Sequence, residues 1–154
     1  METTTMSPAI METEIMGRVL TQVTVENLDD LWSAEDGLLG SEAIRRITVD
    51  DAFVDTGSTT LALPTRYIQQ LGLRKSYEKT STTTRGKATF SVYGPTRITL
   101  LDRFCSVDVV EVPDDVTVLV GQIPLEMLDL VIDLQGRRLT GNPAHNGEHM
   151  LEMY

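Results

Sequence analysis

The chain has 154 residues, which is enough for one ordinary domain and too few for two substantial ones. Hydrophobic residues make up 41% of the sequence, enough to build a packed core, although aromatic residues make up only 5%. Thirteen basic residues against 23 acidic ones give a formal charge of −10, which argues against binding to nucleic acid or to an anionic membrane surface.

The N-terminal segment, residues 1–16, is rich in Thr and Glu and has little apolar pattern, so we expect a disordered lead-in. It carries acidic residues where a secretion signal would carry basic residues before an apolar block. No stretch of the sequence approaches the apolar length of a membrane span. We therefore expect a cytoplasmic protein with one domain over residues 17–143 and a tail over residues 144–154.

The first half of the domain is predicted to contain strands, turns and one short helix. Alternating apolar residues and β-branched types predict strands over 17–28, 43–49 and 59–63. Residues 31–40 are expected to form a loop anchored by Trp32. Residues 64–72 predict a short helix, because Pro64 suits its first turn and Gly72 suits its C-terminal cap.

The second half is predicted to consist mainly of hairpins. Residues 76–92 are rich in Thr and predict a mobile two-stranded ribbon with Arg85-Gly86 at its tip. After it we expect a hairpin of 98–101 with 105–112, a buried strand over 116–120, a second short helix over 123–130, and a closing hairpin of 131–134 with 138–140. Strands dominate, so the predicted fold class is mostly β, a closed barrel with one or two short helices.

The tripeptide Asp55-Thr56-Gly57 places a carboxylate on a tight turn between two apolar runs. We expect Gly57 to supply positive φ there, and neighbouring hydroxyl groups such as that of Ser58 to hydrogen-bond the turn. The turn is either a simple Asx turn at a strand end or a rigidly held acid at the floor of a cleft. Activating water at a peptide bond needs two carboxylates that share a proton, and the tripeptide occurs once in the chain.

Two other motifs carry less weight. An Asp-x-Gly-Ser/Thr-Thr sequence after a strand also occurs in the phosphate loop of actin-like ATPases, but that fold needs two large lobes that 154 residues cannot supply. His145-Asn146-Gly147-Glu148-His149 matches the H-x-x-E-H pattern of some zinc peptidases, yet Gly147 and Pro143 disfavour the required helix. We therefore expect no metal or other cofactor.

Cys105, the single cysteine, is expected to be a small strand residue without chemistry.

The segment Phe53-Val54-Asp55-Thr56-Gly57-Ser58 is followed downstream by Leu119-Val120-Gly121 and a predicted helix. Together these elements resemble the retropepsin-like aspartic proteases, the single-domain relatives of pepsin. More narrowly, residues 120–133 with 139–143 look like the small microbial single-domain members. The resemblance covers about residues 45–143, with both elements in the correct order.

The resemblance implies a retropepsin-like closed barrel and a role for each matching residue. Asp55 would be the catalytic acid on an active-site turn completed by Thr56, Gly57 and Ser58. The flap over the substrate would have its tip at Thr84, Arg85 and Gly86, although the segment 82–87 departs from the glycine-rich flaps of viral members. Leu119, Val120 and Gly121 would lie beneath the site, and Gly121 would permit close packing there; read alone, Gly121 is an ordinary turn glycine.

The resemblance also implies an activity and a partner. The chain would be an aspartic endopeptidase acting on a peptide or protein substrate, with one Asp carboxylate from each subunit of a homodimer activating water, and with no cofactor. The alternative is a non-catalytic dimeric module that binds peptides or supports assembly on the same fold. A third possibility is an inactive monomer that another partner activates.

Overall fold

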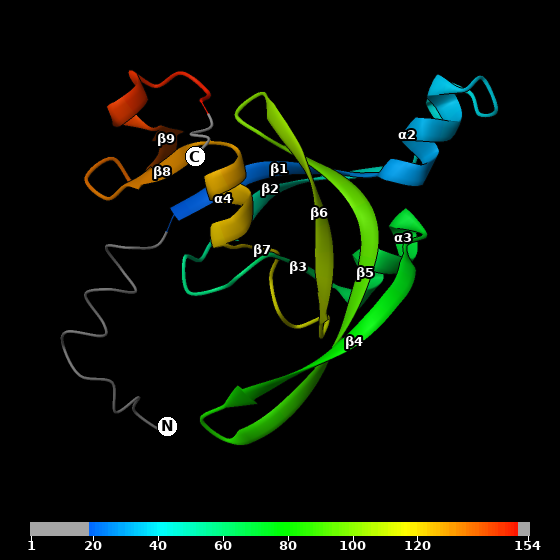
Figure 1. Ribbon diagram of the computed structural model, residues 1–154, viewed down its shortest axis with the longest axis horizontal. Coiled ribbons are helices and arrows are strands. Elements are labelled where there is room, and N and C mark those ends of the chain that lie inside the picture. The colour runs from blue at the N-terminus through cyan, green and yellow to red at the C-terminus, as the bar shows by residue number, and fades with distance from the viewer. Residues whose placement is uncertain (1–18, 151–154) are drawn as a thin grey trace.

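The computed structural model describes residues 19–150 (Figure 1). The lead-in predicted for residues 1–16 lies outside this range. The elements in chain order are β1 (Val19–Asn27), α2 (Leu28–Glu35), the 3-10 helix η1 (Ser41–Ala43), β2 (Arg46–Val54), β3 (Leu61–Pro64), α3 (Thr65–Leu71), β4 (Arg74–Thr83), β5 (Gly86–Leu100), β6 (Arg103–Val112), β7 (Leu119–Val120), α4 (Gln122–Met127), β8 (Leu130–Asp133), β9 (Arg138–Gly141) and the 3-10 helix η2 (Pro143–His145).

Seven strands form a mixed sheet in the order β1-β2-β7-β3-β6-β5-β4. β1 also pairs with β5, from Thr24 opposite Thr99 to Asn27 opposite Thr96, so the sheet nearly closes into a ring (Figure 1). The β2–β7 and β3–β6 pairs are parallel and the others are antiparallel. The predicted mostly β barrel is confirmed, with three short α-helices in residues 19–150 where one or two were expected. None of the helices in that range has the length and apolar character of a membrane span.

The hydrophobic core draws on every strand of the ring except β4, and on α3 and α4. Leu61 and Leu63 of β3 and Val120 of β7 are among its fully buried side chains. Burying one such side chain contributes about 1.5–3 kcal/mol relative to leaving it exposed. The core therefore fixes the strands on both sides of the segment that follows Asp55.

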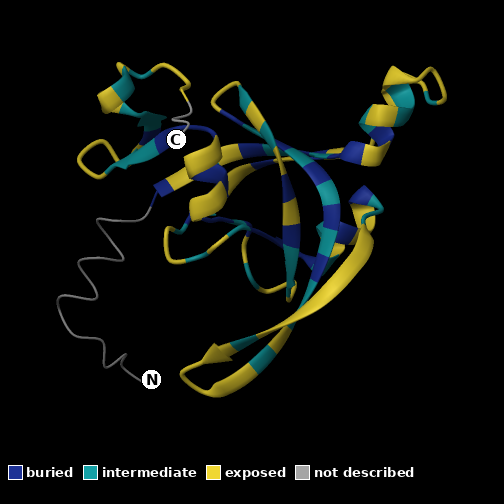
Figure 2. Ribbon diagram, viewed as in Figure 1, coloured by how far each residue is buried: buried dark blue, intermediate teal, exposed yellow. Residues whose placement is uncertain are grey.

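The strands β4 and β5 form the predicted ribbon. β4 ends at Thr83 and β5 begins at Gly86, so the turn lies where the sequence predicted it. Figure 2 shows β4 exposed along nearly all of its length, with only Ser81 of intermediate exposure, where it extends away from the ring. β5 is longer than predicted, since it continues to Leu100 and also pairs with β6, so one strand serves both the ribbon and the next hairpin.

Residues 28–35 form a helix where the sequence predicted a loop anchored by Trp32. The side chain of Asn27 caps this helix by accepting a hydrogen bond from the Asp30 amide at 3.0 Å. The prediction missed this start because the strand pattern of β1 runs directly into it. Trp32 is 49% exposed and is not an anchor. Asp30 is held instead by Arg45 at 2.8 Å, whose hydrogen bond lowers the pKa of that carboxyl.

Other boundaries differ from the prediction by a few residues. The second strand begins at Arg46 and continues to Val54, the strand predicted over 116–120 is limited to Leu119–Val120, and the second predicted helix ends at Met127. The closing hairpin is present as β8 and β9, which form a separate two-stranded sheet.

The segment after β9 packs back onto the domain through Asp129. This buried carboxylate accepts hydrogen bonds from Nδ1 of His145 at 2.6 Å, from Nδ2 of Asn142 at 3.1 Å and from the amide of Met150 at 3.1 Å. The His145 hydrogen bond is the main cause of a lowered Asp129 pKa. Arg103 donates from Nη1 to the carbonyl of Asp129 at 3.0 Å. The end of α4 is thus tied to residues 142–150.

Candidate active site

The strand β7 lies between β2 and β3 and pairs with both. Val54 lies opposite Val120 in the parallel pair, and Leu61 lies opposite the same Val120 in the antiparallel pair. The Asp55 amide continues the ladder by donating to the Val120 carbonyl at 2.9 Å. Residues 55–60 therefore leave the sheet as a loop whose two ends are held by one central strand.

The carboxylate of Asp55 is fixed by its own turn. The Ser58 amide donates to the Asp55 carbonyl at 3.0 Å, which closes the turn. Oδ1 of Asp55 accepts from the Gly57 amide at 2.9 Å, and Oδ2 accepts from Oγ of Ser58 at 3.1 Å. A carboxylate has about four acceptor positions, so these two bonds orient it and leave positions for water or another donor. The hydrogen bonds from Gly57 and Ser58 are those of an Asx turn, and the same two bonds hold the Asp55 carboxylate in a fixed orientation.

Gly57 does not take the positive φ that was expected of it, since the positive-φ glycines of residues 19–150 are elsewhere. Its role here is spatial, because a Cβ would lie 3.1 Å from Oδ1 of Asp55. Thr56 and Gly57 are both exposed, so the outer side of the turn is open.

Gly121 packs directly beneath this loop. The consecutive amides of Gly121, Gln122 and Ile123 donate to the carbonyls of Thr60, Ser58 and Thr59 at 3.0, 2.9 and 2.8 Å. Gly121 has φ −93°, which any residue adopts, so its requirement for glycine is steric. A Cβ would lie 2.5 Å from the Thr60 carbonyl oxygen and 2.6 Å from that of Ser58. Of the three residues expected beneath the site, Val120 and Gly121 are buried and Leu119 is half-buried.

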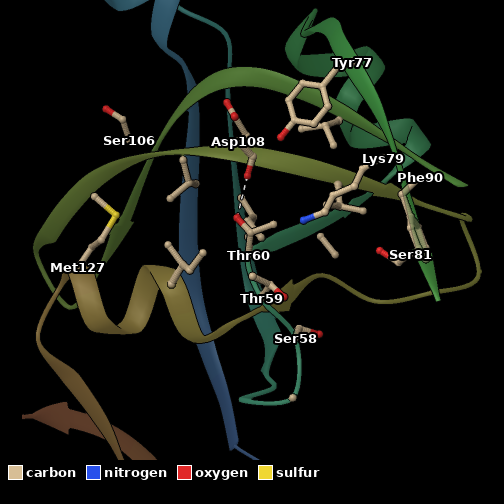
Figure 3. A pocket seen from close by; sticks show the side chains of 17 residues that line it. Ser58, Thr59, Thr60, Tyr77, Lys79, Ser81, Phe90, Ser106, Asp108 and Met127 are labelled. Atoms are coloured by element: carbon tan, nitrogen blue, oxygen red, sulfur yellow. Dashed lines mark hydrogen bonds between the residues drawn. The ribbon is translucent and has the colours of Figure 1, made fainter. Parts of the chain in front are cut away.

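A cleft of about 490 Å³ begins at the turn and runs under the ribbon (Figure 3). Its lining comes from the loop after Asp55, β3, the ribbon, β6 and α4. The lining residues are Gly57, Ser58, Thr59, Thr60, Leu61, Ala62, Tyr77, Lys79, Ser81, Phe90, Val92, Ser106, Val107, Asp108, Val110, Ile123 and Met127. Neither Asp55 nor Thr56 is part of this lining in the single chain.

The predicted flap tip lies away from the cleft. Thr84, Arg85 and Gly86 are exposed at the end of the ribbon and do not line it. The ribbon contributes residues nearer its base, which sequence reasoning did not select: Tyr77, Lys79, Ser81, Phe90 and Val92. Alternation along β4 is the signal that could have found them, because every second residue of a strand faces the same side.

Cys105 lies in β6 with its side chain half-buried, and burial raises its pKa to about 11. A thiol with this pKa is a poor nucleophile at neutral pH, in agreement with the assignment of no chemistry. The two histidines of the H-x-x-E-H pattern face different partners: His145 bonds Asp129, and Nε2 of His149 lies 3.1 Å from the Met127 carbonyl. In residues 19–150 no group of three or more His, Cys, Asp or Glu side chains is placed to hold a metal ion.

No protein-family model and no curated protein matches this chain. Among solved structures, the solution structure of Simian Foamy Virus (mac) protease is similar, with a TM-score of 0.40 and 20% sequence identity. The similarity covers 51% of this chain and 81% of that chain. The viral protein is a retropepsin-like aspartic protease, the family that the sequence resembles.

Proposed function

We propose that this chain is a retropepsin-like aspartic endopeptidase that acts as a homodimer, with Asp55 of each copy supplying one carboxylate. The observation that carries the proposal is the loop after Asp55, which is locked from below by three successive amides and opens into a cleft. A loop held in this way presents its acid with little freedom to reorient, as catalysis by a positioned group requires.

The proposal of a homodimer rests on the single Asp-Thr-Gly turn, because the reaction needs two carboxylates. The chain has one Asp-Thr-Gly turn, and a two-fold axis would bring a second copy of the same turn to the first. The exposed outer side of the turn, at Thr56 and Gly57, is available for that contact. Two adjacent carboxylates do not both ionise easily, so they would hold one proton between them.

The shared proton gives the two carboxylates different tasks. The ionised one removes a proton from water as the water attacks the scissile carbonyl carbon, and the protonated one donates a hydrogen bond to the carbonyl oxygen. The bonds from Gly57 and Ser58 to Asp55 would keep each carboxylate oriented during this step. The ribbon would cover the substrate and reduce its access to bulk water.

The test compares two Asp→Asn substitutions, one within β2 and one in the loop that directly follows β2. Asp55→Asn should abolish cleavage of a broad peptide library between acidic and neutral pH, while Asp51→Asn, at an exposed position of β2, should leave cleavage unchanged. Equal cleavage by both variants would refute the proposal. Light scattering on the same samples should give the mass of two chains.

The non-catalytic alternative makes a different prediction in the same experiment. A dimer that binds library peptides and cleaves none of them would favour a peptide-binding or assembly module. A one-chain mass together with absent cleavage would favour a monomer that needs another partner.

A further inference from the structure

One face of the ribbon forms a wall of the cleft. Tyr77, Lys79 and Ser81 alternate along β4 and therefore share a face, and they pair across the ribbon with Val92, Phe90 and Ala88. Tyr77, Lys79, Ser81, Phe90 and Val92 line the cleft, and we call these five residues the inner face of the ribbon. Figure 3 shows the Lys79 side chain directed from the ribbon into the cleft.

Lys79 is the only basic residue of the cleft lining in the part of the chain that the structure describes. Among residues 19–150 it has no ion pair and no side-chain hydrogen bond, unlike Lys75 of the same strand, which pairs with Glu78 at 2.6 Å. The acidic residue of the lining, Asp108, places Oδ1 against the backbone of Gly94, 2.8 Å from where a Cβ would be. No acidic side chain of residues 19–150 therefore pairs with the Lys79 ammonium.

The surroundings of Lys79 strengthen its effect on a bound peptide. Phe90 lies directly across the ribbon, and Ile123 and Met127 of α4 line the same cleft, so the lining is largely apolar. A charge beside apolar walls and a covering peptide acts through a lower effective dielectric than in bulk water. A substrate carboxylate brought under the ribbon near Lys79 would recover part of its desolvation cost there through attraction to the ammonium.

We infer that Lys79 is a specificity-determining residue that selects peptides with an acidic side chain, Asp or Glu, at the position beneath the ribbon. This inference rests on the proposed peptidase function of the same cleft. The preference is local, because the chain as a whole carries a charge of −10 and would disfavour acidic peptides at long range.

The ribbon also provides a matched control. Lys87 is exposed and pairs with Thr82, which places it on the ribbon face opposite to the inner face. Lys87→Glu and Lys79→Glu change the net charge of the chain equally. Only the second changes the charge inside the cleft, so a difference between them separates a local contact from the overall charge.

The experiment measures binding separately from cleavage. Fluorescein-labelled octapeptides that carry Glu, Gln or Lys at one scanned position are titrated by anisotropy against the full chain with Asp55→Asn, so that bound peptides stay intact. At one scanned position Glu should bind about two- to fivefold more tightly than Gln. Lys79→Met should bring this ratio to one, Lys79→Glu should favour the Lys peptide, and Lys87→Glu should leave the ratio unchanged.

Three results would overturn the inference: no position with a Glu preference, an equal loss of preference in the Lys79 and Lys87 variants, or no peptide binding at all. Cleavage of the same peptides by the chain with Asp55 intact is scored separately. Cleavage without a Glu preference would overturn the inference alone. A Glu preference in binding without any cleavage would support the inference and overturn the peptidase activity.

Discussion

The amide of Gly121 donates to the carbonyl of Thr60 at 3.0 Å, and a Cβ on Gly121 would lie only 2.5 Å from that same oxygen. Gly121→Ala must therefore push the loop that carries Asp55 away from α4. Overpacking of this kind costs about 1–3 kcal/mol. We expect urea denaturation to show a loss of that size in the free energy of unfolding, and peptide cleavage to fall with it.

Gly40→Ala is the control for this substitution. Gly40 has φ −68°, and the three atoms nearest to a Cβ there would be terminal atoms of the exposed Glu42 side chain, which can move. Its free energy of unfolding should change by no more than about 0.5 kcal/mol. If Gly121→Ala behaves like Gly40→Ala, the loop is not supported from beneath in the way described.

Ser58 is expected to position the Asp55 carboxylate through its 3.1 Å hydrogen bond to Oδ2. Ser58→Ala should lower kcat about tenfold while KM changes little, because a hydrogen bond to a charged group is lost and the cleft walls stay in place. Steady-state kinetics on one cleaved peptide measures both constants. Ser76→Ala, at an exposed position of β4 outside the cleft lining, should change neither. A rise in KM alone for Ser58→Ala would assign this hydroxyl to substrate binding instead.

The Asp129 carboxylate predicts a stability that depends on pH. Its pKa is lowered in the folded chain, chiefly by the His145 hydrogen bond, so its contribution is complete above the unfolded-state pKa of about 3.9 and is lost as the pH falls through the lower folded-state pKa. Asp129→Asn should lower the urea midpoint at neutral pH. The difference from the parent chain should shrink as the pH falls below about 4. A difference that stays constant to pH 2 would contradict the ionic origin.

Cys105 should be unreactive, because burial raises its pKa to about 11. At pH 7.5 little thiolate forms, so iodoacetamide should label the folded chain far more slowly than the urea-unfolded chain. Mass spectrometry over time measures both rates. Equally rapid labelling of the folded and unfolded chains would contradict the burial of this thiol in β6.

The loop that follows Asp55 could be predicted because its signals are local. Asp55 and Gly57 sit between two apolar runs, and Gly121 follows a short apolar strand, so each motif could be located without knowing the fold. The positive φ predicted for Gly57 was wrong, and the constraint on this position is instead the 3.1 Å at which a Cβ would meet Oδ1 of Asp55, which depends on how the Asp55 side chain is turned.

Features that depend on distant segments could not be predicted in the same way. The pairing of Val120 with both Val54 and Leu61 joins three segments that no local pattern links. The helix after Asn27 was missed because the strand pattern leads straight into it, and the inward direction of Lys79 depends on which face of the ribbon meets the cleft.

A mixing experiment tests the central claim that two copies of Asp55 form one active site. A fixed amount of the parent chain is refolded with increasing amounts of the full chain carrying Asp55→Asn, and the cleavage rate is measured. If each active site needs Asp55 from two chains, random pairing should lower the rate to about one half at equal amounts and to about one tenth at a ninefold excess of the variant. A rate that stays constant at every ratio would contradict the shared site.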